Sequence, residues 1–301
     1  MAPRHFLSLF DLSRDEARAL IARASELKRL RAHGIRPMMF PRKVLAMIFE
    51  KSSTRTRVSF ESAMIEGGGG AVFLSLTDSQ LGRGEPIQDT ARVLSKMCDA
   101  ITARTHAHRT LEDLASYATV PVINALSDRL HPCQVLADLQ TFTEHRGEIA
   151  ARRVAWIGDG NNMCNTYIEA AQVFDFELVI STPPEYAPEL QQFLRGAAKV
   201  WWTQEPREAA TGADLVVTDV WVSMGQEADA GARRTLLRPY QVDSALMSHA
   251  KHDALFMHCL PAHRGEEVTQ EVIDHPDTVV WDEAGNRLHA QKALLEFLFA
   301  H

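Results

Sequence analysis

Short apolar segments alternate with longer segments of helical period along almost the whole chain, and this alternation limits the possible folds. The segment 43–49 (K-V-L-A-M-I-F) is apolar after its first residue, and a predicted helix over 54–66 follows it, ending at four glycines. Parallel strands need a long crossover between them, and that crossover is usually a helix. The alternation therefore predicts the α/β class, with parallel sheets covered by helices on both faces.

The alternation occurs in two runs, separated by a polar break (H-R-G-E) at 145–148. In the first run the further predicted strands are 71–75, 100–103 and 121–125, and the further helices are 13–31, 85–97, 110–117 and 132–145. In the second run the predicted strands are 153–157, 177–180, 199–202, 214–218, 254–257 and 278–281, and the helices are 162–174 and 284–301. The sequence therefore predicts two doubly wound domains with parallel central sheets, 1–147 and 148–283, linked by interdomain helices.

The composition is that of an ordinary globular protein and excludes several function classes. The 301 residues are 46% hydrophobic and 24% charged, with a formal net charge of −7. Without a basic excess we expect no nucleic-acid partner, and an anionic ligand must be bound by a local cluster. We expect no membrane partner, because no stretch approaches the roughly 20 apolar residues of a membrane span. The four cysteines form no C-x-x-C pair, so we expect free thiols and a cytoplasmic location.

Ligands of such sheets lie beyond the carboxyl ends of the strands, so the loops there are the candidate sites. The loop after 43–49 reads S-S-T-R-T-R (52–57) and opens a predicted helix. Free N–H groups at a helix start favour an anion, and guanidinium forks suit phosphate oxygens. The loop predicts a phosphate site, although the same hydroxyls would also serve a solvated helix cap. No Walker-type glycine loop is present.

Two further features follow strands of the first run. Arg104 comes directly after the strand 100–103, where it could also be solvated. His131 precedes Pro132, a favourable first helical residue, which places His131 at the helix cap. His131 could donate to a carbonyl oxygen and Gln134 could bind an amide, but a capping role for His131 fits equally well. His131 and Cys133 lack a second ligand pair at zinc-site spacing.

The loop 158–162 (G-D-G-N-N) of the second run resembles a dinucleotide-binding turn. Met163 replaces the third glycine of that fingerprint, so the signal is weak, although Glu177 lies at a tolerable spacing for a ribose contact. Asn161 and Asn162 could instead hold a carboxylate. The loop supports two readings.

Two other loops of the second run suit an amino acid. Asp219 follows a strand and its carboxylate suits an ammonium group, while Ser223 and a turn at Gly225 could bind a carboxylate. A solvated aspartate is the alternative. In His258-Cys259-Leu260-Pro261 a cysteine nucleophile would need a base. We expect the side chain of His258 to point away from its neighbour, so Cys259 is interpreted as a binding group.

Four motifs occur together in a characteristic order: S-T-R-T-R (53–57), H-P-x-Q (131–134), D-x-x-x-S-M-G (219–225) and H-C-L-P (258–261). Through them the chain resembles the ornithine carbamoyltransferases, essentially from end to end. The first two motifs mark the wider carbamoyltransferase superfamily, whereas S-M-G and H-C-L-P point to ornithine. The resemblance implies transfer of the carbamoyl group from carbamoyl phosphate to the δ-amine of L-ornithine, giving L-citrulline and phosphate, as in arginine biosynthesis.

The resemblance also implies a role for individual residues. Carbamoyl phosphate would be bound by Ser53, Thr54, Arg55, Thr56, Gln80, Arg104, His131, Gln134 and Arg287, with the carbonyls of Cys259 and Leu260. Ornithine would be bound by Asn162, Asp219, Ser223 and Met224, with Cys259 near its side-chain nitrogen. The catalytic residues would be Arg104, His131, Asp219 and Cys259.

Further expectations come from the resemblance. Residues 1–147 would bind carbamoyl phosphate, 148–283 would bind ornithine, and the helix 284–301 would pack back on the first domain. The Leu260–Pro261 bond is expected to be cis. We expect no metal and no organic cofactor, a homotrimer or a multiple of it, and domain closure on substrate binding.

Alternatives remain at this point. One is a carbamoyltransferase for another amine acceptor, such as N-acetylornithine or putrescine. A remote one is an NAD-dependent oxidoreductase that uses the loop 158–162, and another is a non-catalytic binding protein with the same fold. The sequence does not decide between the biosynthetic and the breakdown direction.

Overall fold

The computed structural model describes residues 3–75, 84–196, 198–223 and 227–300. The chain forms two compact units. The first consists of Met1–Gln140 with Gly285–His301, and the second of Thr141–Ala284. The division falls within two helices, α5 (Pro132–Arg146) and α12 (Val280–Phe299), so each of these helices contributes residues to both units.

The first unit is built on a four-stranded sheet in the order β2-β1-β3-β4. Its strands are all parallel: β1 (Val44–Phe49), β2 (Gly70–Ser75), β3 (Ala100–Arg104) and β4 (Val122–Leu126). The chain adds β2 on one side of β1, and then β3 and β4 on the other side. Strand order therefore reverses between β1 and β3. A ligand site of such a sheet is expected beyond the carboxyl ends of β1 and β3.

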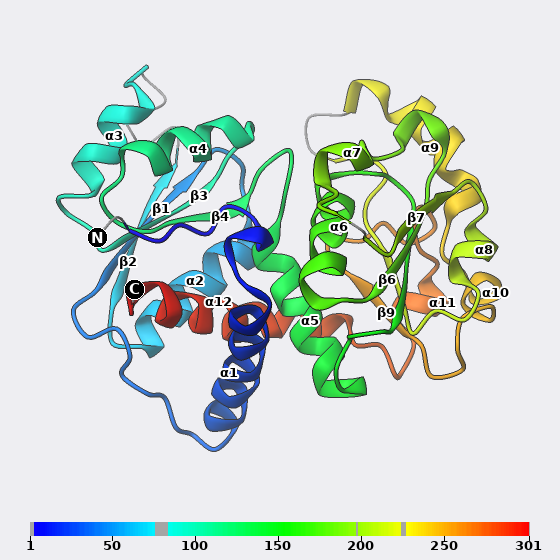
Figure 1. The fold of residues 1–301 in the computed structure, drawn as a ribbon, viewed down its shortest axis with the longest axis horizontal. Helices are drawn as coiled ribbons and strands as arrows, with labels where there is room; N and C mark the ends of the chain where they lie inside the picture. The colour runs from blue at the N-terminus through cyan, green and yellow to red at the C-terminus, as the bar shows by residue number, and fades with distance from the viewer. Residues whose placement is uncertain (1–2, 76–83, 197, 224–226, 301) are drawn as a thin grey trace. The chain divides into compact units, whose positions relative to one another are not determined.

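Helices cover both faces of this sheet, as Figure 1 shows. On one face lie α3 (Ile87–Leu94) and α4 (His108–Tyr117), and on the other α1 (Arg14–Ala32) and α2 (Thr54–Glu66), with α12. Ala46 and Ile48 of β1 belong to the apolar cluster under α3 and α4, and the alternating residues Leu45 and Met47 are buried as well. This two-sided burial explains why β1 is a continuous apolar run.

Local sequence sets the ends of these helices. Ser13 and Glu16 form the reciprocal capping box at the start of α1 that their spacing indicates. Glycines follow the carboxyl end of α2. Gly68 has a φ of +83°, and a Cβ on Gly69 would lie 2.7 Å from the carbonyl oxygen of Lys43. The glycine run therefore ends the helix and lets the chain turn directly into β2.

The second unit is built on a five-stranded sheet in the order β7-β6-β5-β8-β9. The strands are parallel: β5 (Arg153–Ile157), β6 (Glu177–Ser181), β7 (Val200–Thr203), β8 (Leu215–Thr218) and β9 (Leu255–His258). Here strand order reverses between β5 and β8. The two parallel sheets confirm the predicted doubly wound α/β class.

The helices of the second unit are mostly short. The longest described helix that lies wholly within this unit is α6 (Asn162–Phe174), with 13 residues. The others are α7 (Leu190–Phe193), α8 (Pro206–Ala210), α9 (Ala230–Leu237), α10 (Ser244–Met247) and α11 (Gln270–Ile273). A core of buried residues from β5, β8 and β9 packs against α8, α10 and α11. Helices of one or two turns give too little periodicity to be found in a sequence.

One predicted element is wrong. Residues 278–281, expected as a strand, lead into α12, which begins at Val280 rather than at 284. Asp282 and Glu283 lie in the first turn, where the helix dipole favours negative charge. Val279, Val280 and Glu283 are buried whereas Trp281 is 54% exposed, and this spacing is that of a helix face. The β-branched residues at 278–280 favour a strand in isolation, but tertiary packing overrides this local propensity. The predicted helix 85–97 is also shorter, spanning Ile87–Leu94 after Pro86 as its cap.

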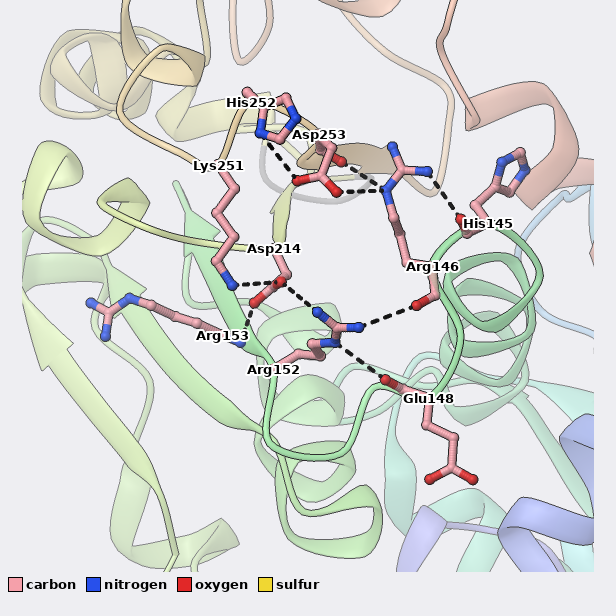
Figure 2. A network of polar contacts seen from close by, with 9 residues as sticks. All are labelled: His145, Arg146, Glu148, Arg152, Arg153, Asp214, Lys251, His252 and Asp253. Carbon is pink, nitrogen blue, oxygen red and sulfur yellow. Dashed lines mark hydrogen bonds and ion pairs between the residues drawn. The ribbon is translucent and has the colours of Figure 1, made fainter.

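A polar network lies at the amino ends of the strands in the second unit (Figure 2). Asp214, just before β8, accepts hydrogen bonds from the backbone N–H of Arg153 (2.9 Å), Lys251 Nζ (2.8 Å) and Arg152 Nη1 (3.2 Å). Burial alone would raise the pKa of Asp214, but these hydrogen bonds and cations lower it. The network fixes the strand starts, and it lies at the edge of the sheet opposite to the expected ligand site.

Among the helices that the structure describes, none combines the length and the apolar composition needed to cross a membrane.

Candidate active site

The first candidate group surrounds the start of α2 in the first unit. Ser53 is the N-cap residue, and its Oγ accepts a hydrogen bond from the backbone N–H of Thr56 (3.3 Å). The first turn therefore consists of Thr54, Arg55 and Thr56, which follow β1 at the point where strand order reverses. The positive end of the helix dipole and the guanidinium of Arg55 together favour an anion at this place.

Arg287 joins this turn to the start of α5. Its Nη1 donates to Gln134 Oε1 (2.5 Å) and its Nη2 donates to Thr56 Oγ1 (3.0 Å). Arg287 is only 2% exposed and lies two turns into α12. Gln134 is oriented further by Asp138, whose Oδ1 accepts from Gln134 Nε2 (2.8 Å). The structure thus brings together three residues that the sequence analysis assigned to one site.

His131 and Arg104 belong to the same surroundings. His131 is the cap residue of α5, because its carbonyl oxygen accepts from the backbone N–H of Gln134 (3.1 Å). Burial, and then the guanidiniums of Arg287, Arg104 and Arg55, hold the pKa of His131 well below its usual value. The imidazole is therefore neutral at physiological pH. Three guanidiniums around a neutral ring make this part of the first unit strongly positive.

Cys133 is close in the chain to both His131 and Gln134. Cys133 is buried, its Sγ donates to the carbonyl of Asn124 (3.3 Å), and burial raises its pKa to about 12. Its thiol is therefore protonated and serves as a weak donor inside the first unit. Gln80, which the resemblance places in the same site, lies outside the described residues.

The second candidate group lies at the carboxyl edge of the sheet in the second unit. Asp219 follows β8, and its Oδ2 accepts from Asn161 Nδ2 (2.7 Å). Its Oδ1 accepts from the backbone N–H of Val220 (2.8 Å) and from the thiol of Cys259 (3.1 Å). The loops after β5, β8 and β9 therefore meet at one carboxylate, which is 7% exposed.

Asn161 holds Asp219 through its side-chain amide, which donates to the carboxylate. Asn161 is the N-cap of α6, and its Oδ1 accepts from the backbone N–H groups of Met163 (2.9 Å) and Cys164 (3.2 Å). Asn162 is the first residue of that helix. Both asparagines were candidates to hold a carboxylate, and the resemblance then assigned ornithine to Asn162 alone. The missed signal was the glycine-asparagine step before the helix, which is typical of a cap.

The glycines of the loop 158–162 have structural reasons. Gly158 has a φ of +124°, and a Cβ on Gly160 would lie 2.3 Å from the carbonyl oxygen of Tyr186. The backbone of the same chain thus occupies the space beside Gly160. Glu177, considered for a ribose contact, forms an ion pair with Arg153.

His258 points away from its neighbour Cys259, as predicted. Its Nδ1 accepts from the backbone N–H of Leu260 (2.9 Å), so Nε2 carries the proton and donates to Glu267 Oε1 (3.2 Å). Both His258 and Glu267 are fully buried. Leu260 has a φ of +57°, and the Leu260–Pro261 bond is cis, which confirms that expectation.

Two residues assigned to ornithine remain at the limit of the description. Ser223, half-buried, is the last described residue of the loop after β8. Met224, like Gly225, lies outside the described residues.

The fold and these two residue groups define a two-unit α/β protein, with guanidiniums gathered at a helix start in one unit and a buried carboxylate in the other. Two family models then match consecutive parts of the chain. Residues 4–144 match the carbamoyl-P binding domain of aspartate/ornithine carbamoyltransferase, and residues 150–298 match its Asp/Orn binding domain. The chain belongs to the aspartate/ornithine carbamoyltransferase family. It is a carbamoyltransferase.

Individual relatives are similar over their full length. The ornithine carbamoyltransferase of Methylococcus capsulatus is 62% identical over 298 residues, covering 99% of both chains. The anabolic ornithine carbamoyltransferase of Pseudomonas aeruginosa is 58% identical, covering 100% of this chain and 99% of that protein. The solved structure of ornithine carbamoyltransferase from Pyrococcus furiosus has a TM-score of 0.93 at 49% identity, covering 98% of this chain and 96% of that one. These matches favour the transferase reading over the oxidoreductase reading.

Proposed function

We propose that this chain transfers the carbamoyl group of carbamoyl phosphate to the δ-amine of L-ornithine, giving L-citrulline and inorganic phosphate. The observation that carries the proposal is the carboxylate of Asp219, held by three loops in the unit that matches the Asp/Orn binding domain. A buried carboxylate suits the ammonium group of an amino acid. The full-length relatives named ornithine carbamoyltransferase support the same acceptor.

In this proposal residues 1–147, with the helix 284–301, form the carbamoyl phosphate-binding domain. The phosphate binds at the start of α2, with the hydroxyls of Ser53, Thr54 and Thr56 and the guanidinium of Arg55. Thr56, Arg104 and His131 donate to the carbamoyl oxygen. Arg287 and Gln134 complete the site, together with Gln80, and Gln134 receives the carbamoyl amine. The positive surroundings and the neutral state of His131 support these roles.

Residues 148–283 form the ornithine-binding domain. Asp219 binds an ammonium group of ornithine, Asn162, Ser223 and Met224 bind the rest of the amino acid, and Cys259 lies near the side-chain nitrogen. The carbonyls of Cys259 and Leu260 accept from the carbamoyl amine. The hydrogen bond between Cys259 and Asp219 supports placing both residues in one acceptor site.

The chemical step follows from these roles. The neutral δ-amine attacks the carbamoyl carbon, a new C–N bond forms, and negative charge develops on the carbamoyl oxygen. Donors aimed at that oxygen stabilise the charge, and removal of one such donor typically costs roughly 10²–10³-fold in rate. The C–O bond to phosphate then breaks. The leaving phosphate takes the proton of the amine, so the step needs no protein base, metal or organic cofactor.

The proposal extends to assembly, location and direction. Exposed apolar side chains occur on α2 (Val58, Ile65) and on the edge strand β2 (Val72) of the first unit, which supports burial of this face in a homotrimer.

The four free cysteines support a cytoplasmic location. Two relatives named anabolic support the biosynthetic direction, toward arginine. Light scattering after gel filtration tests the trimer, which would have the mass of three chains.

The acceptor is tested by an assay of carbamoyl transfer to a panel of amines: ornithine, N-acetylornithine, putrescine, lysine and aspartate. The ureido product and phosphate are measured in parallel, with carbamoyl phosphate alone as the control for hydrolysis. We expect stoichiometric citrulline and phosphate with ornithine, and the rate should rise with pH as the neutral amine becomes more abundant. A preference for another amine would keep the transferase assignment and overturn the proposed acceptor.

A further inference from the structure

Arg233 of α9 has an unusual set of partners within the second unit. Its Nη2 lies 2.5 Å from Asp159 Oδ2, and its Nε donates to the carbonyl oxygen of Trp221 (2.6 Å). Its Cζ lies 4.2 Å from the centre of the Tyr186 ring. Both side chains of the ion pair are less than a tenth exposed. Neither Arg233 nor Asp159 is among the residues to which the motifs assign a role.

These partners lie on the two loops that hold Asp219. Trp221 is two residues after Asp219 on the loop that follows β8. Asp159 is two residues before Asn161 on the loop that follows β5, and Asn161 Nδ2 donates to Asp219 Oδ2 (2.7 Å). One guanidinium therefore ties together the loop that carries the carboxylate and the loop that orients it.

A guanidinium is well suited to this task. Its planar fork donates in fixed directions and its face stacks on an aromatic ring, whereas an ammonium is a point charge on a flexible stem. Burial raises the pKa of Asp159 to about 6, although Arg233 opposes that rise. Loss of Arg233 would leave a buried carboxyl without its counter-ion, and the loop after β5 would rearrange or the carboxyl would become protonated.

Arg234, the next residue of α9, forms an exposed ion pair and contacts neither loop in this way. Arg234 Nε donates to Glu266 Oε1 (3.0 Å), and the Arg234 side chain is 50% exposed. Exposed pairs of this kind contribute little to stability. The adjacent arginines of α9 therefore provide a matched pair, one that contacts both loops at Asp219 and one that faces solvent.

We propose that Arg233 is a positioning residue for the acceptor site, which sets the place of the Asp219 carboxylate by holding the Trp221 carbonyl and Asp159 together. The inference rests on the proposed function, because it assigns Asp219 to the amine substrate. Arg233 itself touches no reacting atom. It acts on acceptor binding and leaves the carbamoyl phosphate site of the first unit unchanged.

The test compares Arg233→Gln and Arg233→Lys with the matched control Arg234→Gln in the full-length protein. Steady-state kinetics give the KM for ornithine and kcat, calorimetry gives the Kd of carbamoyl phosphate without ornithine, and thermal unfolding reports folding. We expect the KM for ornithine of Arg233→Gln to rise at least about tenfold, because a 1 Å displacement of a positioned group can cost roughly 10²-fold. The Kd of carbamoyl phosphate and all constants of Arg234→Gln should remain those of the wild type.

A double-mutant cycle with Asp159→Asn separates positioning from general destabilisation. If both side chains act through one link, the effects of Arg233→Gln and Asp159→Asn on the KM for ornithine will be less than additive. Should Arg233→Gln not fold, Arg233→Lys keeps the charge and serves the same cycle, and we expect it to recover only part of the ornithine affinity.

The outcomes separate the two proposals. A wild-type protein without activity toward ornithine overturns the proposed acceptor, and the inference with it. A wild type that is active toward ornithine, combined with an unchanged KM in the folded Arg233 variants, overturns the inference alone. Equal losses of ornithine and carbamoyl phosphate affinity would also overturn it, because they would indicate a purely structural role.

Discussion

Arg287 Nη2 donates to Thr56 Oγ1 at 3.0 Å, although the two residues are 231 positions apart in the chain. Thr56 lies in the first turn of α2, and Arg287 reaches it from α12 while also binding Gln134 of α5. One buried guanidinium thus joins the starts of two helices that come from separate strand-to-helix loops. The proposed carbamoyl phosphate site depends on this long-range link.

Substitution Arg287→Met should therefore weaken binding of carbamoyl phosphate. The variant removes donors to Thr56 and Gln134 and one positive charge, and a hydrogen bond to a charged group is worth about 1.5–3 kcal/mol, so we expect a loss of roughly tenfold to 10²-fold in affinity. Calorimetric titration with carbamoyl phosphate measures it. The control is Glu296→Gln, which lies on the same helix as Arg287 and breaks a half-buried pair with Arg23 of α1. Equal affinities in Arg287→Met and the control would contradict the proposed site.

His131 should make stability depend on pH in a defined direction. Burial and the cations around it hold its pKa well below 6.5 in the folded chain, so below pH 6.5 the unfolded chain binds a proton that the folded chain does not. The contribution to stability is complete above pH 6.5 and is lost progressively as the pH falls below it. Urea unfolding between pH 5 and pH 8 measures how the free energy of unfolding changes with pH. In His131→Gln this slope should fall by an amount equivalent to at most one bound proton. Parallel slopes in the two proteins would show that His131 titrates normally.

Glu16 should affect stability at a lower pH. A hydrogen bond from Arg4 lowers its pKa to about 2, although burial acts in the opposite direction, and Ser13 contributes through the capping box. Because the folded pKa is the lower one, the stabilisation is present above pH 4.5 and is lost as the pH falls toward 2. At pH 7, Glu16→Gln should cost up to about 1 kcal/mol, because Gln can keep the capping box but loses the ion pair with Arg4. Denaturant unfolding should show the difference shrink below pH 4.5. Glu26→Gln on the exposed face of α1 is the matched control, and a difference that does not vary with pH would refute this assignment.

The sequence predicted the parts of the structure that depend on neighbouring residues. Strand β5 and helix α6 have the predicted bounds, because a short apolar run and the polar, glycine-containing loop after it are local signals. Residues 278–281 were assigned wrongly because Val280 is buried by packing on a helix face. Arg233 and Arg234 are identical in local sequence terms, and only the fold buries one and exposes the other. Contacts such as Arg287 with Thr56 arise from tertiary structure, and here the sequence pointed to them only through resemblance.

Cys259 provides the test of whether the acceptor site uses a thiol to bind or to attack. Its thiol donates to Asp219 Oδ1 (3.1 Å), and the adjacent His258 is engaged by Leu260 and Glu267. If the thiol only binds, Cys259→Ala should lower kcat/KM for ornithine by roughly tenfold to 10²-fold. This is the contribution of one hydrogen bond to a charged group.

The magnitude of that loss decides between the two roles. Removal of a catalytic nucleophile costs on the order of 10⁶-fold, so clear residual activity in Cys259→Ala supports a binding role. Cys133→Ala, at a thiol whose pKa is raised to about 12 by burial, is the control for loss of a cysteine elsewhere in the chain. Turnover should be followed at saturating carbamoyl phosphate, so that only the acceptor site limits the rate. Trapping of a carbamoylated Cys259 from radiolabelled carbamoyl phosphate would overturn the binding role, since direct attack by the amine forms no covalent enzyme intermediate.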